Sequence, residues 1–177
     1  MRKPVLIVVC GLSFAGKTTL ATAIAKRFAY EQVDVDDTKV RLFGVTFEEN
    51  SLDQEAWNRI YEETDREIQA HLAAHKSVVD ASRNFKRRER DRARALAHRS
   101  GARVIVVYVD TPERVARQRM LANRCRPTRV DWGDASFEQV VLAMQPPAHD
   151  EDPVVFHYQD NIETWITEHS VWLAPRD

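Results

Sequence analysis

Eight residues near the N-terminus have the types and spacing of a loop that binds phosphate. The segment Gly11-Leu12-Ser13-Phe14-Ala15-Gly16-Lys17-Thr18 matches the pattern G-x-x-x-x-G-K-[S/T]. Glycines let backbone N–H groups approach phosphate oxygens, and the start of the following helix adds a partial positive charge. The lysine would reach the β- and γ-phosphates and the threonine hydroxyl would bind Mg²⁺. The alternative is an ordinary glycine-containing turn with an exposed lysine.

The remaining sequence narrows the class of phosphate-binding protein. It has no Asn-Lys-x-Asp segment for reading guanine and no Leu-Ser-Gly-Gly-Gln transporter signature. These absences disfavour a GTPase switch or a transporter subunit. The predicted contacts to Mg-ATP are Gly11, Ser13, Ala15, Gly16, Lys17, Thr18 and Thr19, with Mg²⁺ on Thr18.

Two carboxylates end short apolar segments further along the chain. Asp36 follows residues 33–35, and Asp80 closes residues 77–80. A carboxylate there can act on an acceptor hydroxyl as a general base. Asp36 has a second interpretation as a helix N-cap, and Asp37 is a weaker candidate for the same catalytic role. Asp80 could hold an Mg²⁺-bound water, orient the loop lysine or touch the acceptor, or it could be a loop carboxylate without a role.

Arginines supply the opposite charge. Arg119 belongs to an expected helix, and residues 124–134, which begin with Arg124, lose the apolar period and form an expected lid or mobile loop. Both arginines could neutralise charge on a transferred phosphoryl group. A solvated helix face is the alternative for both.

The elements that must position these residues alternate between strands and helices. The expected strands are residues 5–10, 33–35, 77–80, 104–109 and 154–157. The expected helices are residues 17–29, 51–75 and 111–123, with others ending near residue 44, ending at 100–101, starting at 136 and containing Trp165. This alternation predicts a single α/β domain over residues 1–177, a three-layer α/β/α fold with a mostly parallel five-stranded sheet.

Taken together, the motifs resemble those of the P-loop kinases related to polynucleotide kinase, zeta toxin and chloramphenicol phosphotransferase, a family of small bacterial AAA-domain kinases. The residues that carry the resemblance beyond the P-loop are Asp36-x-x-Lys39-x-Arg41-Leu42-Phe43-Gly44, Val79-Asp80-Ala81-Ser82 and Thr111-Pro112-Glu113 with Arg119 and Arg124. The resemblance implies that Asp36 is the base that acts on the acceptor. Lys39 stands where relatives often carry arginine, and lysine lacks the planar fork of that side chain.

A basic stretch over residues 83–94 has two interpretations. It could follow a nucleic-acid backbone, or it could be an exposed helix face on which Glu89 and Asp91 form local ion pairs.

His71 and His75 lie one helical turn apart and are expected to be a surface pair, since no third metal ligand is evident. The tryptophans are expected to fill a core or pack a terminal helix, and these are Trp57, Trp165 and Trp172.

Composition excludes several classes of protein. The chain has 177 residues, is 44% apolar and 30% charged, and carries a net charge of −1, which is consistent with a folded domain. Cys10 and Cys125 do not form a disulfide framework. No apolar run is long enough to span a membrane, and Lys17 would interrupt a signal peptide. A cytoplasmic location is expected.

The sequence therefore predicts a kinase that moves the γ-phosphoryl group of Mg-ATP to a hydroxyl of a small or nucleotide-like acceptor. Lys17, Asp36, Arg119 and Arg124 are the predicted catalytic residues, and Asp36, Lys39 and Asp80 would contact the acceptor. Asp80 is also a candidate for Mg²⁺ binding through a water. Two alternatives stay open: a polynucleotide 5′-hydroxyl kinase, and an ATP-binding regulatory module without catalysis. The acceptor and the oligomeric state are not specified.

Overall fold

A computed structural model describes residues 3–44, 52–126 and 133–175 of the chain. The strands are β1 (Val5–Cys10), β2 (Glu31–Val33), β3 (Val78–Asp80), β4 (Arg103–Asp110) and β5 (Val154–His157). The helices are α1 (Lys17–Phe28), α2 (Val35–Phe43), α3 (Gln54–Ala73), α4 (Arg87–Arg99), α5 (Glu113–Cys125), α6 (Gly133–Ala143), α7 (Ile162–Glu168) and α8 (Ser170–Leu173). A short 3₁₀ turn, η2 (His149–Glu151), precedes β5.

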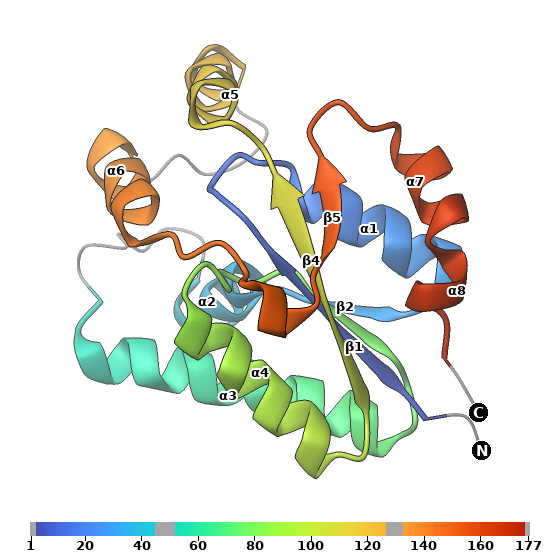
Figure 1. Ribbon diagram of the computed structural model, residues 1–177. Coiled ribbons are helices and arrows are strands. Elements are labelled where there is room, and N and C mark those ends of the chain that lie inside the picture. Colours follow the sequence, from blue (N-terminus) through green and yellow to red (C-terminus); the bar gives the residue numbers. More distant parts are fainter. Residues whose placement is uncertain (1–2, 45–51, 127–132, 176–177) are drawn as a thin grey trace.

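The five strands form one parallel sheet in the order β2-β3-β1-β4-β5, as the alternation predicts. β1 is fully buried at the centre because helices cover both faces (Figure 1). Its residues Val5, Ile7 and Val9 pack with α1, α7 and α8, whereas Leu6 and Val8 pack with α3 and α4. Alternate side chains of a strand point to opposite faces, so this uniformly apolar strand supplies both cores. The three-layer α/β/α fold is confirmed.

Because the strands are parallel, the loops that follow them lie next to one another at one edge of the sheet. The carboxyl ends of all five strands lie at one edge, and the crevice outside this edge is where open α/β sheets bind ligands. The segment after β1 is the P-loop, and α5 and α6 extend beyond the same edge (Figure 1). A smaller apolar cluster of Ala116, Met120 and Phe137 joins α5 to α6 and contacts Leu12 and Phe14 of the P-loop. The loop is thereby packed against the part of the chain that carries the predicted lid.

Two strands have the predicted bounds, and the other boundaries differ for local reasons. β1 and β5 are confirmed as 5–10 and 154–157. The prediction of a strand at 33–35 is wrong, since β2 ends at Val33 and α2 begins at Val35. Asp34 lies between them and caps α2, because its side chain accepts a hydrogen bond from the Asp36 backbone N–H at 2.9 Å.

Three helices also begin differently from the prediction. The N-cap of α3 is Asp53, whose carboxylate accepts from the Ala56 backbone N–H, and Ser51 lies outside the described residues. α6 begins at Gly133, so Ser136 is inside the helix rather than its cap. The Thr111 hydroxyl does not cap α5, because it donates to the Ala15 carbonyl oxygen at 2.9 Å. A predicted cap therefore binds the P-loop instead.

The remaining general expectations concern cysteines, tryptophans and the membrane. Both cysteines are free, as predicted. Trp165 is buried in the core beneath α1, and Trp172 lies in the terminal helix α8 with about half of its surface exposed. No helix in the described parts of the chain is long and apolar enough to cross a membrane.

Candidate active site

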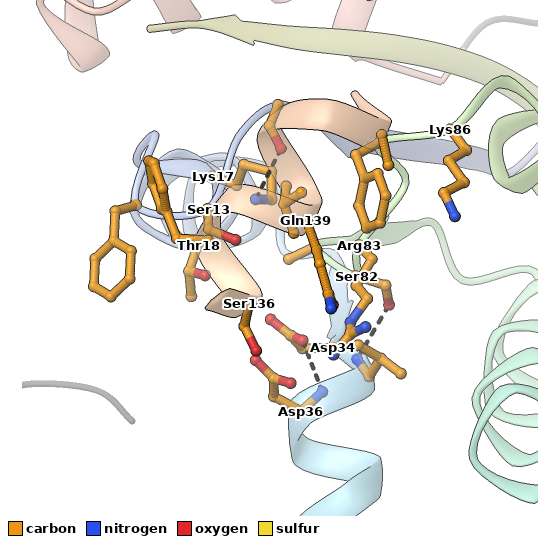
Figure 2. Close-up of a pocket in the computed structure, with 18 of the residues that line it drawn as sticks. Ser13, Lys17, Thr18, Asp34, Asp36, Ser82, Arg83, Lys86, Ser136 and Gln139 are labelled. Atoms are coloured by element: carbon orange, nitrogen blue, oxygen red, sulfur yellow. Dashed lines mark hydrogen bonds between the residues drawn. The ribbon is translucent and has the colours of Figure 1, made fainter. Parts of the chain in front are cut away.

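A cleft of about 620 Å³ opens at the carboxyl edge of the sheet. Its walls come from the P-loop, from the start of α2, from the first turn of α3, from the segment after β3 and from α6 (Figure 2). The polar and charged side chains that line it are Ser13, Lys17, Thr18, Asp34, Asp36, Ser82, Arg83, Lys86, Ser136 and Gln139. Segments far apart in the sequence therefore meet around one cavity.

The P-loop end of the cleft is shaped by its backbone. Gly11 has φ +145°, and a Cβ there would lie 2.7 Å from the Val109 carbonyl oxygen, so only glycine fits beside β4. Gly16 has φ +107° and leads directly into α1. The Lys17 ammonium donates to the carbonyl oxygens of Leu12 at 2.8 Å and Gly11 at 3.2 Å. These contacts hold the Lys17 side chain across the loop. A phosphate bound there would compete with the two carbonyl oxygens for the ammonium group.

The predicted contacts of the P-loop do not all face the cleft. Gly11, Ser13, Lys17 and Thr18 line it, whereas Ala15, Gly16 and Thr19 are not among the lining residues. Ala15 is buried and its carbonyl oxygen accepts hydrogen bonds from behind the loop. The predicted contacts of Ala15, Gly16 and Thr19 with ATP remain predictions.

Arg119 contacts the P-loop on the side away from the cleft. Its guanidinium donates to the Ala15 carbonyl oxygen at 2.7 Å, the same oxygen that the Thr111 hydroxyl contacts. A Cβ on Gly16 would lie 3.5 Å from this guanidinium. The side chain does not line the cleft, so its predicted action on a transferred phosphoryl group would require it to leave this contact.

Arg124 lies at the end of α5, in line with the expected position of the lid. Its guanidinium pairs with the Asp134 carboxylate at 2.8 Å, which joins the end of α5 to the first turn of α6. The predicted lid, residues 124–134, is helical at both ends, and residues 127–132 lie outside the described part of the chain. α6 itself contributes Ser136 and Gln139 to the cleft wall.

Two carboxylates line the middle of the cleft, Asp34 and Asp36 (Figure 2). The Asp36 side chain is 43% exposed and forms an ion pair with Lys39, whose own side chain is 1% exposed. Lys39 therefore holds the Asp36 carboxylate from below and does not line the cleft itself. Asp37 is exposed and also does not line it.

Asp34 has an unusual environment. Burial raises the pKa of its carboxyl group to about 7, and the nearby Asp36 charge adds to this effect. A carboxyl group with such a pKa changes charge near neutral pH, which is common at catalytic sites. Asp34 is thus a titratable group that faces the cleft beside the predicted base.

Asp80 is placed elsewhere. Its buried carboxylate accepts from the Ser82 backbone N–H and from the Asn84 side-chain amide, both at 2.9 Å. Burial raises the pKa of this group. Asp80 lines a second, smaller pocket between α3 and α4 and not the cleft, so in the described structure it shapes the turn after β3. Its predicted contacts with a metal-bound water or an acceptor remain predictions.

The residues at the P-loop end fit a magnesium ion held together with nucleotide phosphates. The Thr18 hydroxyl and the Asp34 carboxylate are potential oxygen ligands that line the same cleft. Mg²⁺ prefers oxygen ligands and is commonly held by one or two side chains plus substrate phosphates. Within the described residues no group of three or more His, Cys, Asp or Glu side chains is placed to hold a metal ion.

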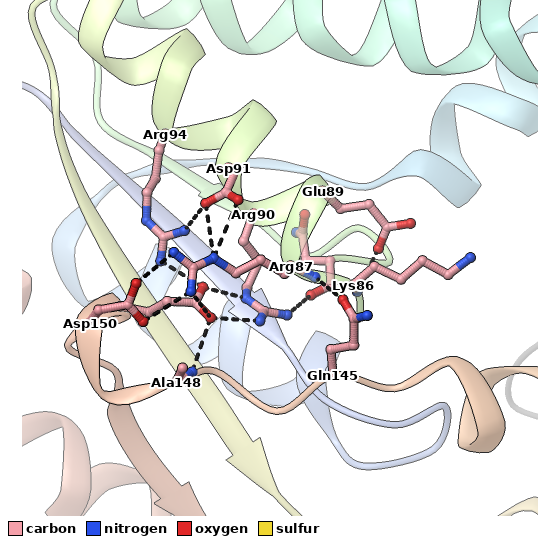
Figure 3. Close-up of polar contacts among 11 residues, drawn as sticks. Lys86, Arg87, Glu89, Arg90, Asp91, Arg94, Gln145, Ala148 and Asp150 are labelled. Carbon is pink, nitrogen blue, oxygen red and sulfur yellow. Dashed lines mark hydrogen bonds and ion pairs between the residues drawn. The ribbon is translucent and has the colours of Figure 1, made fainter.

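The basic stretch that begins α4 is largely neutralised (Figure 3). Arg90 is fully buried and forms a two-pronged ion pair with Glu151, with both distances 2.8 Å. Arg94 also contacts Glu151 at 2.7 Å, and Arg87 forms two hydrogen bonds to Asp150. The expectation of a solvated face with local pairs is wrong for Arg90, since the chief partners come from η2 and not from α4.

Loss of the Glu151 charge should destabilise the fold. We expect Glu151→Gln to cost about 3–5 kcal/mol, because it leaves the Arg90 charge buried without its partner. Hydrogen bonds from Arg90 lower the pKa of Glu151 from 4.5 to about 2, so this stabilisation is complete above about pH 4.5 and is lost as the pH falls toward 2. Urea unfolding at pH 7 and pH 3 measures it. The control, Asp150→Asn, removes an exposed pair and should cost at most about 1 kcal/mol.

Several cleft residues were missed by sequence reasoning. Asp34 was overlooked because the strand was placed two residues late, although an aspartate before a helical turn is a common N-cap signal. Trp57 was expected in the core but lines the cleft, and so do Arg83, Ser136 and Gln139. No local pattern identifies the last three, because Arg83 reaches the cleft through the segment after β3, and Ser136 and Gln139 reach it through the packing of α6.

Most of the chain matches the model of one known protein family. Residues 6–147 match a family model described as an AAA domain, AAA_33. No curated protein matches the chain in sequence. Among solved structures, a sugar kinase from Janibacter sp. HTCC2649 has a TM-score of 0.69 at 23% identity, over 96% of this chain and 94% of its own.

Two further structures share the fold. A gluconokinase from Sinorhizobium meliloti 1021 has a TM-score of 0.64 at 20% identity, over 98% of this chain and 93% of its own. Kti12 from Chaetomium thermophilum, solved with ADP-AlF3, has a TM-score of 0.78 at 16% identity, over 97% of this chain and 100% of its own. The family model covers most of the chain, so the chain belongs to the AAA_33 family of AAA domains.

Proposed function

We propose that the protein is an ATP-dependent phosphotransferase that moves the γ-phosphoryl group of ATP to a hydroxyl of a small acceptor. One observation carries this proposal: Lys17 and Thr18 of the P-loop and the carboxylate of Asp36 line the same cleft. A phosphate-binding end and a candidate general base share one cavity, which is the arrangement that phosphoryl transfer to a hydroxyl needs.

The residues divide the work of positioning and proton transfer. The P-loop amides and the Lys17 ammonium would bind the triphosphate, with the lysine exchanging its contacts to Leu12 and Gly11 for phosphate oxygens. The acceptor oxygen would form a bond to the γ-phosphorus while the bond from that phosphorus to the bridging oxygen of ADP breaks. The acceptor proton would pass to the Asp36 carboxylate, which Lys39 holds in place.

Magnesium and the arginines complete the proposal. Mg²⁺ bound with ATP supplies neutralisation of phosphate charge, and Thr18 with Asp34 would hold it. Arg119 and Arg124 would neutralise the transferred group only after α5 and α6 move toward the cleft. Closure of this kind would exclude water, which otherwise competes with the acceptor as a nucleophile.

Transfer from γ-labelled ATP tests the proposal. Purified protein, Mg-ATP and a broad panel of sugars, polyols, nucleosides and hydroxy acids should yield a labelled acceptor. Rapid hydrolysis of ATP without transfer to any acceptor would contradict it. The sugar kinase and the gluconokinase of the same fold support small polyhydroxy compounds as the first members of the panel.

The polynucleotide alternative loses its main support. It relied on free positive charge along residues 83–94, but Arg87, Arg90, Arg92 and Arg94 are paired with carboxylates of the same chain. Phosphate contacts by these side chains would first have to break those pairs. We therefore favour a small acceptor.

A further inference from the structure

The cleft carries positive charge on the side away from the P-loop. Figure 2 shows Arg83 and Lys86 apart from Ser13 and Thr18, on the far side of the cavity. Both side chains line the same cleft as Asp34 and Asp36. Lys17 would contact the triphosphate at the other end, which places these two cations on the acceptor side of the cleft.

Arg83 is pre-positioned by an aromatic side chain. Its guanidinium lies over the Trp57 ring at 4.5 Å from the centroid, and that ring stacks on Tyr61 of the same helix. Stacking of an arginine on an aromatic face leaves the N–H groups at its edge able to bind an anion. Fixing the side chain in advance lowers the entropy that binding would cost. The contact therefore fixes the plane of the Arg83 guanidinium at a set place in the cleft wall.

Lys86 contributes a second charge close by in sequence and in the same wall. Its ammonium lies 5.4 Å from the centroid of the Phe85 ring, and both residues line the cleft. Among residues 3–44, 52–126 and 133–175 this ammonium has no carboxylate within ion-pair distance. Its neighbours in α4 differ, because Arg87, Arg90, Arg92 and Arg94 each have one. Lys86 is thus a cation that lines the cavity without an ion pair among the described residues.

The backbone that carries both cations is anchored by buried polar contacts. Asp80 accepts hydrogen bonds from Ser82 and Asn84, and the Asn84 carbonyl oxygen accepts from Arg90, which Glu151 fixes in turn. Asn84 has φ +43°, in the left-handed region that asparagine tolerates better than most residues. The segment 82–86 is therefore held in one conformation, as a specific subsite requires.

The geometry points to an anion subsite formed by Arg83 and Lys86, so that the acceptor is a hydroxyl compound bearing a phosphate or a carboxylate. This inference rests on the proposed function, because it names the class of acceptor for the same cleft. The anionic group would bind at the cationic wall, and the hydroxyl would lie by Asp36 between that wall and the P-loop. A planar arginine fork and a lysine ammonium suit both kinds of anion.

A binding experiment tests the subsite without any turnover. Protein saturated with magnesium and a non-hydrolysable ATP analogue is titrated with glucitol, gluconate and glucitol 6-phosphate, which share a linear six-carbon chain and differ in charge. We expect at least one anion to bind at least tenfold more tightly than glucitol. The stronger of the two distinguishes a phosphate from a carboxylate subsite. Equal or absent binding of all three would overturn the inference.

Variants assign the binding to the two side chains. Arg83→Gln and Lys86→Gln should each weaken binding of the preferred anion at least tenfold while leaving the affinity for the ATP analogue unchanged. The control is Arg88→Gln, which removes an exposed charge from the first turn of α4, outside this cleft, and should change neither affinity. An affinity for the anion that is unchanged in both the Arg83→Gln and the Lys86→Gln variant would also overturn the proposed subsite. Salt-dependent binding of an oligonucleotide in preference to these probes would instead assign the cations to nucleic acid.

The two proposals fail in different ways. Anion binding that depends on Arg83 and Lys86, without transfer of label to any hydroxyl, would contradict the kinase and keep the subsite. Label transfer to neutral glucitol as efficient as transfer to the two anions would keep the kinase and contradict the subsite. For an anionic acceptor that is phosphorylated, Arg83→Gln should raise the KM for that acceptor at least tenfold with the KM for ATP unchanged.

Discussion

A Lys17→Ala variant should lose phosphoryl transfer by a factor of about 10²–10³ or more, because it removes the cation that would contact the β- and γ-phosphates. The side chain lies at the cleft and contributes contacts to Leu12 and Gly11 rather than to the apolar core. Its removal should therefore leave the free energy of unfolding almost unchanged. Transfer from γ-labelled ATP and calorimetry with Mg-ATP measure the loss, and thermal unfolding verifies the fold.

A matched lysine on the same helix provides the control. Lys26 is exposed in the last turn of α1, and Lys26→Ala should retain wild-type transfer and affinity for Mg-ATP. Near-normal turnover in Lys17→Ala would contradict the assignment of residues 11–18 as the nucleotide site. So would a failure of the wild-type protein to bind Mg-ATP at all.

Asp36→Asn should reduce kcat by about 10²–10⁴, the range expected when a general base is removed. Asparagine keeps an oxygen that can accept from Lys39, so the local contact survives while the basic carboxylate is lost. Affinity for Mg-ATP should be unchanged. Single-turnover transfer and nucleotide binding, measured on the same preparation, separate the two effects.

The adjacent carboxylate supplies the control for this experiment. Asp37 has the same charge one residue further along α2 but is exposed and does not line the cleft, so Asp37→Asn should retain full activity. Loss of activity in Asp37→Asn and not in Asp36→Asn would move the base to Asp37. An Asp36→Asn protein with intact biological activity would instead support the regulatory ATP-binding module.

Asp34 should control how the reaction depends on pH. Burial raises the pKa of its carboxyl group to about 7, so this group gains its charge as the pH rises through 7. If the charged form binds the metal–nucleotide complex, kcat/KM should rise about tenfold per pH unit below 7 and level off above it. Asp34→Asn should remove this limb and lower activity at all pH values. A limb that persists in the variant would assign it to another group.

Local sequence patterns determined the architecture and one end of the site. The uniformly apolar segment 5–10, the glycine-lysine-threonine pattern after it and the apolar period of residues 17–29 each specify their structure over a few neighbouring residues. The order of the elements then favours a parallel sheet, because right-handed crossovers allow few other arrangements. The P-loop was therefore identifiable without coordinates, and the family match over residues 6–147 agrees with it.

The acceptor side of the cleft was decided by tertiary packing. Nothing local distinguishes Arg83 and Lys86, which face the cavity, from Arg90, which is buried against Glu151 some 61 residues away in sequence. Asp34 and Asp36 differ by two residues, yet a strand that ends at Val33 gives one a buried and the other a half-exposed carboxylate. Periodicity records which residues are apolar. The environment of a charge depends on the segments packed around it, and those contacts exist only in the folded chain.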